Sequence, residues 1–179
     1  RKYEEVVLMT ASLARLLRQS ISNEDEVVPL AREVEYAKGY LTIQKMRYKD
    51  KLEFEIDVEP SILNIPLIKL VLQPIIENAI YHGLKYKESK GLLQVKGFMK
   101  DGNAVLQVID NGVGMDEETL SHIYDKHKVN YHSNGVGVYN VQKRLKLYYG
   151  ENYGITYESE KGVGTTATIT IPGIQEESI

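Results

Sequence analysis

Residues 72–83 form an apolar helix pattern that is interrupted by polar side chains. Asn78 and His82 are four positions apart, so they lie on one face of a helix, with Tyr81 close to both. Burying an amide and an imidazole without partners costs several kcal/mol. The two side chains therefore either satisfy each other or the backbone within a core, or they face a ligand. The Asn78 amide oxygen suits Mg²⁺ carried by a triphosphate, because this ion prefers hard oxygen ligands.

Glu77 is the second chemically interesting residue of this helix. It adjoins Asn78 but projects about 100° away around the helix axis. It either polarises an incoming nucleophile or braces a neighbouring loop. One turn before Asn78 the chain has Pro74, which offers no side-chain base.

Residues 109–115 are a strand end that runs into two glycines. Asp110 before Asn-Gly is commonly a turn aspartate. However, Gly112 and Gly114 would also let the backbone approach a flat ring closely. A carboxylate at this point can accept a hydrogen bond from the amino group of adenine, whereas the carbonyl oxygen of guanine would be repelled. A buried polar site of this kind discriminates by roughly 10⁴-fold.

Two further glycine pairs could shape a ligand site. Gly135, Val136 and Gly137 precede a helix pattern over residues 138–149, and free N–H groups at a helix start favour phosphate. The alternative is a flexible end of the polar loop 126–134, which we interpret as a lid over a nucleotide. Gly162 and Gly164 predict a hairpin turn before Thr165.

The elements that must position these residues follow from hydrophobic periodicity. Apolar stripes predict helices over 3–20 and 30–48, which we interpret as an arm rather than as part of a sheet domain. Alternation predicts a strand over 52–58. The remaining pattern predicts helices over 66–84, 116–124 and 138–149 and hairpins over 92–109 and 154–171. This order indicates an α+β fold, a two-layer α/β sandwich with a mixed sheet and helices on one face.

Composition narrows the class of protein. A chain of 179 residues, 42% of them hydrophobic, is long enough for one ordinary domain with a core. The net charge of −3 argues against nucleic-acid binding. The absence of cysteine excludes disulfides and fits a reducing compartment. The longest apolar stretch, 62–80, holds too many polar residues to span a bilayer, so we expect no membrane contact from this chain.

In their order, the glycine-rich and asparagine-bearing motifs resemble the N, G1 and G2 boxes of the ATP-binding fold shared by histidine kinases, gyrases, Hsp90 and MutL. Together with residues 33–47 and 135–145, they look like sensor histidine kinases of the LytS/YesM type. The resemblance covers about residues 13–172. It implies a histidine-kinase-like ATPase (Bergerat) fold with an N-terminal helical arm.

The resemblance also implies ATP and Mg²⁺ as cofactors and assigns the site residues. Glu77 and Asn78 would be catalytic, and Asn78 would hold the metal. Thr165 would reach the adenine-binding Asp110 through water. Many relatives carry lysine at the position of Tyr81, which cannot supply that charge. The implied nucleotide-binding residues are Asn78, Tyr81, His82, Asp110, Gly112, Gly114, Met115, Gly135, Val136, Gly137 and Thr165.

Hydrolysing relatives have a glutamate at the position of Pro74, so its absence favours phosphoryl transfer to an external acceptor. Kinases of this type transfer the γ-phosphoryl of ATP to a histidine and then to a response-regulator aspartate. No acceptor box occurs here, and the chain begins at Arg1 without Met, so we expect a fragment. Residues 1–48 would be the distal part of a dimerisation module, 49–173 the catalytic domain and 174–179 a tail. The parent would be a membrane-anchored homodimer with this portion in the cytoplasm.

Two other functions stay open at this level. One is an ATPase or Ser/Thr kinase of the same fold, although the helical arm over residues 13–47 argues against it. The other is a degenerate nucleotide-binding regulatory module that binds ATP without transferring phosphate.

Overall fold

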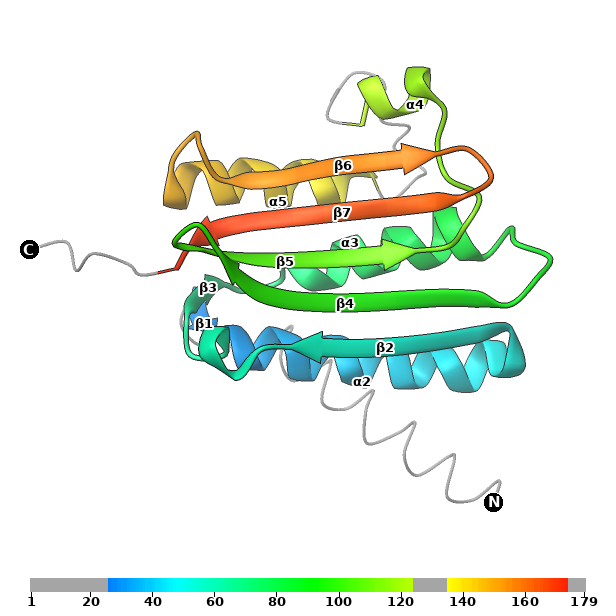
Figure 1. Cartoon of the computed structure of the whole chain (residues 1–179), viewed down its shortest axis with the longest axis horizontal. Coiled ribbons are helices and arrows are strands. Elements are labelled where there is room, and N and C mark those ends of the chain that lie inside the picture. Colours follow the sequence, from blue (N-terminus) through cyan, green and yellow to red (C-terminus); the bar gives the residue numbers. More distant parts are fainter. Residues whose placement is uncertain (1–25, 124–134, 174–179) are drawn as a thin grey trace, which may run out of the picture.

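A computed structural model describes residues 26–123 and 135–173 (Figure 1). The helix expected over 3–20, the proposed lid over 126–134 and the tail lie outside the described residues. The elements are β1 (Val27–Pro29), α2 (Leu30–Tyr48), β2 (Leu52–Val58), β3 (Pro66–Ile68), α3 (Leu72–Asn78), the π-helical turn η3 (Ala79–Leu84), β4 (Gly91–Lys100), β5 (Asn103–Asp110), α4 (Glu117–Ser121), α5 (Gly135–Tyr149), β6 (Gly154–Glu160) and β7 (Gly164–Pro172).

The main sheet has the strand order β2-β4-β5-β7-β6, and only the β2–β4 pair is parallel. Helices α2, α3 and α5 lie behind one face of this sheet, as Figure 1 shows. The expected α+β sandwich with a mixed sheet is confirmed. The register pairs Asp110, the last residue of β5, with Thr165 near the start of β7. This pairing brings two of the predicted site residues together at one edge of the sandwich.

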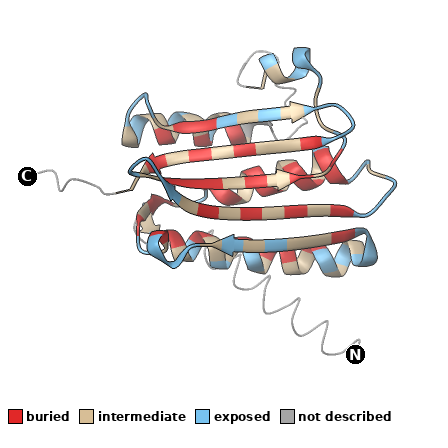
Figure 2. Ribbon diagram, viewed as in Figure 1, coloured by how far each residue is buried: buried red, intermediate tan, exposed pale blue. Residues whose placement is uncertain are grey.

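Alternation along the strands builds the core between the two layers (Figure 2). In β4, buried residues alternate with partly exposed ones, as the period of two requires. The inward side chains pack against the apolar faces of the helices. The most deeply buried residues of the sheet and the helices include Leu72, Ile76, Leu93, Leu106, Leu145 and Ile169. In the part of the chain that the structure describes, no helix combines the length and apolar character needed to cross a membrane.

Helix α2 has the predicted bounds but not the predicted place. We expected it to belong to an arm separate from the sheet domain, yet it packs against α3 and β2. Leu30, Ala37 and Leu41 are essentially inaccessible to solvent and belong to the same core as the sheet. The apolar stripe of α2 is buried by its own domain, so residue 48 marks no break in the packing.

The helix expected from residue 66 begins later. Pro66–Ile68 is instead strand β3, which pairs antiparallel with β1. The Tyr149 hydroxyl group fixes this strand, because it accepts from the Ile68 N–H at 3.2 Å and donates to the Pro66 carbonyl at 3.1 Å. Leu70 then has a left-handed φ of 62°, which separates the strand from α3. Tertiary hydrogen bonds therefore override the helical pattern of this segment.

Candidate functional site

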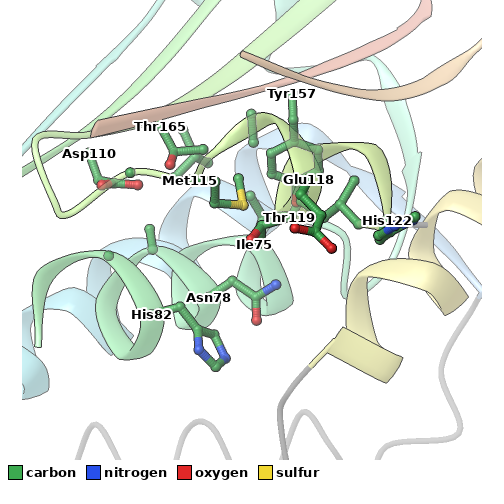
Figure 3. A pocket seen from close by; sticks show the side chains of 16 residues that line it. Ile75, Asn78, His82, Asp110, Met115, Glu118, Thr119, His122, Tyr157 and Thr165 are labelled. Atoms are coloured by element: carbon green, nitrogen blue, oxygen red, sulfur yellow. The ribbon is translucent and has the colours of Figure 1, made fainter. Parts of the chain in front are cut away.

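A cavity of about 550 Å³ lies between α3–η3 on one side and the end of β5 with the start of β7 on the other, with α4 at its edge (Figure 3). Asn78 and His82 reach it from α3 and η3. The predicted site residues that line this cavity are Asn78, His82, Asp110, Gly114, Met115 and Thr165. The side chains of Asn78, from the helix motif, and Asp110, from the strand-end motif, thus line one cavity.

Asp110 is buried in the cavity wall, with 6% of its surface exposed. Its Oδ1 accepts a hydrogen bond of 2.8 Å from the Gly112 N–H, and the Thr165 N–H also donates to the carboxylate. Burial raises the pKa of Asp110 to about 6, while these N–H groups and the charge of Lys87 act in the opposite direction. The carboxylate is therefore held in a fixed orientation at the edge of a largely apolar cavity.

Two glycines allow the helix and the loop after β5 to touch. A Cβ on Gly83 would lie 2.7 Å from Asp110 Oδ1, and a Cβ on Gly112 would lie 2.4 Å from the Gly83 carbonyl carbon. The contact is closed by a 3.1 Å hydrogen bond from the Val113 N–H to the Gly83 carbonyl. The position of Asp110 relative to η3 therefore depends on the missing side chains of Gly83 and Gly112.

The β6–β7 hairpin fixes the other side of the same loop. Gly114 has a φ of 63°, and a Cβ there would lie 1.9 Å from the Glu160 carbonyl oxygen. Ser159 Oγ accepts from the Met115 N–H at 2.8 Å and lies 2.9 Å from Thr165 Oγ1. The Thr165 hydroxyl group is thus bonded to Ser159, while its N–H serves Asp110. The water-mediated contact between Thr165 and Asp110 stays a prediction.

The side chain of Asn78 lines the cavity and carries a buried oxygen. Its Oδ1 has no hydrogen-bond partner within the described protein, although it is fully shielded from solvent. An unpaired buried acceptor is costly unless a ligand satisfies it. His82, one turn farther along, is exposed by its overall surface, and the partial burial of its imidazole lowers the pKa of this group, helped by the nearby charge of Lys85. The lowered pKa favours the neutral form of the imidazole.

Glu77 and Tyr81 do not line the cavity, contrary to expectation. Glu77 Oε1 accepts from Gln73 Nε2 at 3.0 Å on its own helix. Tyr81 is hydrogen-bonded to Tyr40 of α2, and burial with the nearby charge of Glu77 raises the pKa of Tyr40. The cause is helix geometry, because residues adjacent to Asn78 and His82 in sequence project about 100° away from them, toward α2.

The Gly135-Val136-Gly137 segment opens α5, which starts three residues earlier than predicted. A Cβ on Gly137 would approach Pro74 Cβ to 3.4 Å, so α5 begins against the helix that bears Asn78. Gly137 is not part of the cavity wall, and Gly112 contributes only through its N–H to Asp110. The predicted contacts of Gly135, Val136 and Gly137 with phosphate stay predictions.

Several cavity residues were missed by the sequence reasoning. Asp116 caps α4, since its Oδ1 accepts from the Thr119 N–H at 3.0 Å. The cap pattern does not show which face of α4 meets the cavity. The register of the β6–β7 hairpin places Tyr157 opposite Ala167, which also lines the cavity, so this register would have identified Tyr157. The missed lining residues with polar side chains are Glu118, Thr119, His122 and Tyr157.

Comparison with known proteins gives two family matches. Residues 64–175 match the family described as "Histidine kinase-, DNA gyrase B-, and HSP90-like ATPase", and residues 1–52 match the family described as "Histidine kinase". Sensor histidine kinase YesM of Bacillus subtilis is 32% identical over 169 residues, which cover 94% of this chain and 28% of YesM. Sensor protein LytS of Oceanobacillus iheyensis is 34% identical over 143 residues, which cover 78% and 24%. The chain spans about a quarter of the length of these curated relatives.

Solved structures show the same fold. The catalytic domain of histidine kinase ThkA matches with a TM-score of 0.61 at 16% identity, covering 83% of this chain and 99% of that one. The histidine kinase domain from Erythrobacter litoralis EL346 blue-light activated histidine kinase matches with a TM-score of 0.59 at 15% identity, covering 94% and 71%.

Proposed function

The chain belongs to the family of histidine kinase-, DNA gyrase B- and HSP90-like ATPases, and we propose that it binds Mg·ATP between Asn78 and Asp110 for transfer of the γ-phosphoryl group to a protein histidine. Its YesM- and LytS-type relatives are sensor histidine kinases. The proposal includes a homodimeric parent protein that carries the acceptor histidine, and a response-regulator aspartate that receives the phosphoryl group next. It also includes a cytoplasmic location for this portion of the parent.

The observation that carries the proposal is the pair of polar groups in one cavity. The Asp110 carboxylate is buried, oriented by two N–H groups and directed at an apolar space. Such an acceptor suits the exocyclic amino group of adenine and repels the carbonyl oxygen of guanine. Discrimination of this type is strong because the rejected base leaves a buried polar group unpaired.

Asn78 would hold the metal through its Oδ1. This oxygen is buried without a protein partner, and its residue lines the cavity, which fits a hard cation. Within residues 26–123 and 135–173, no cluster of three or more histidine or acidic side chains is arranged to hold a metal. Phosphate oxygens and water must then supply the remaining ligands. When bound, Mg²⁺ would offset the negative charge of the triphosphate.

Transfer is favoured over hydrolysis by what helix α3 presents. Pro74 offers no base, and the carboxylate of Glu77 is bound to Gln73 outside the cavity wall. No carboxylate from α3 therefore reaches the cavity to activate water. This arrangement supports an acceptor that enters from another protein segment.

Titration calorimetry on Asp110→Ala tests the adenine site. A lost charge-assisted hydrogen bond costs about 1.5–3 kcal/mol, which corresponds to roughly 10- to 150-fold weaker ATP binding. An unchanged affinity would refute the placement of adenine.

Transfer is tested separately. This chain and labelled ATP are added to a YesM-type kinase that retains its acceptor histidine but has an inactive nucleotide site. Label on that histidine is expected. Steady release of phosphate without labelled protein would instead indicate an ATPase.

A further inference from the structure

A buried glutamate joins α2 to the helix that bears Asn78. Only 2% of Glu33 is exposed. Its Oε1 accepts from the Leu70 N–H at 2.8 Å, and its Oε2 accepts from the N–H groups of Val71 at 2.9 Å and Leu72 at 3.1 Å. These three amides stand at the start of α3. Glu33 does not line the cavity, so no part of the proposed site accounts for it.

The first amides of any helix lack intrahelical partners. Helix α3 has no capping side chain of its own, because the residue at its N-cap position is Val71. Glu33 provides the cap from a different helix, with a carboxylate that favours the positive end of the helix dipole. The same carboxylate also holds Leu70 in its left-handed conformation, at a φ of 62° that a branched residue seldom adopts.

The charge of Glu33 is compensated by its surroundings. Burial raises the pKa of Glu33, whereas the three N–H groups and the positive charge of Arg144 lower it. Arg144 belongs to α5, which begins at Gly135 against α3. Glu33 thus joins α2 to the start of α3, within the electrostatic influence of Arg144 on α5.

Asn78 is the last residue of α3, six residues or about 9 Å beyond Leu72. A single short helix transmits a shift of its first turn to its last. Helix α2 also contacts the chain just after Asn78, through the hydrogen bond between Tyr40 and Tyr81. The Asn78 amide therefore lies between two points at which α2 holds this helix.

We propose that Glu33 is a positioning residue for Asn78: by capping α3 from α2, it sets where the Asn78 oxygen stands in the cavity. The inference rests on the proposed function, because it assigns Glu33 to the triphosphate end of the Mg·ATP site. Asp110 is held by β5 and by the N–H groups of Gly112 and Thr165, and it touches the helix only at Gly83, five residues beyond Asn78. Glu33 should therefore affect Mg·ATP affinity more than adenosine affinity.

A double-mutant cycle tests this inference on the full chain, with Glu33→Gln, Asn78→Ala and the double variant. Glutamine removes the charge and turns an amide group toward three N–H donors. Affinities for ATP with Mg²⁺ and for adenosine are measured by calorimetry well below the melting temperature. We expect Glu33→Gln to weaken Mg·ATP binding by roughly 2- to 30-fold, the range for coupling through packed elements, and to weaken adenosine binding clearly less. In the Asn78→Ala background it should cause no further loss.

Glu35→Gln removes the same charge from the exposed side of α2 and should bind both ligands like the wild type. If Glu33→Gln does not fold, Glu33→Asp keeps the charge, shortens the side chain and is expected to weaken Mg·ATP selectively. An equal Glu33→Gln loss with and without Asn78, an equal loss for adenosine, or no loss would overturn the inference while leaving the proposed function intact. Full Mg·ATP affinity in Asn78→Ala would overturn both.

Discussion

A methyl group at Gly83 should disturb the nucleotide site through Asp110. The new Cβ would lie 2.7 Å from Asp110 Oδ1 and 3.0 Å from its Cγ, whereas ordinary contacts of Cβ atoms begin at 3.4 Å. The carboxylate is not free to move away, because it is buried and bound to the Gly112 N–H at 2.8 Å. Gly83→Ala must therefore either displace Asp110 or separate η3 from the loop after β5.

The size of the effect follows from two opposing contributions. Overpacking in a close-packed site costs about 1–3 kcal/mol, while replacing a helical glycine by alanine contributes up to about 1 kcal/mol of stability. We expect a net destabilisation of about 0–2 kcal/mol. ATP binding should fall much further, by roughly 10- to 150-fold, if the oriented hydrogen bond to adenine is lost.

Gly39→Ala is the matched control. Gly39 lies within α2, and a Cβ there would meet no atom within 4 Å. This variant should be more stable than the wild type by about 0.5–1 kcal/mol and bind ATP normally. Urea denaturation and calorimetry on both variants give the comparison. Wild-type ATP affinity in Gly83→Ala would show that Asp110 does not read the base.

Two further predictions concern pH and a tyrosine. The pKa of Asp110 in the ligand-free fold is about 6, against an ordinary value of 3.8. Between about pH 4 and pH 6 its carboxyl group therefore holds a proton in the folded protein that it has lost in the unfolded chain. The contribution of Asp110 to stability should therefore decrease as pH rises from about 4 to 6. Adenosine affinity should fall on acidification below about pH 6. The Asp110→Asn variant should show neither pH dependence in denaturation and binding measurements. Tyr149→Phe leaves the Ile68 N–H and the Pro66 carbonyl without their partner, so unfolding experiments should show a loss of about 1–3 kcal/mol, and an unchanged stability would contradict this assignment of the hydroxyl group.

The resemblance of the motifs, in their order along the chain, to the boxes of the histidine-kinase ATP-binding fold led us to expect that Asn78 and Asp110 share a cavity. The hydrophobic periodicity placed Asn78 and His82 on one helix face and Asp110 at the end of a strand. Both predictions depend on local geometry, which periodicity describes well. The confirmed hairpins have the same origin, since turn residues and alternation specify them locally.

The features that the sequence did not predict depend on contacts between segments far apart in the chain. Pro66–Ile68 forms a strand because β1 and Tyr149 satisfy its backbone, and no pattern within that segment shows this. Tyr81 turns toward Tyr40, a residue of a helix that we had assigned to an arm. The role of Glu33 was invisible for the same reason, because its partners lie 37–39 residues away.

The most direct measurement is a crystal structure of this chain with Mg²⁺ and a non-hydrolysable ATP analogue. We predict that the adenine amino group donates to the Asp110 carboxylate and that Asn78 Oδ1 coordinates the metal. A nucleotide bound outside this cavity, or an Asn78 oxygen turned away from the metal, would contradict the proposed site.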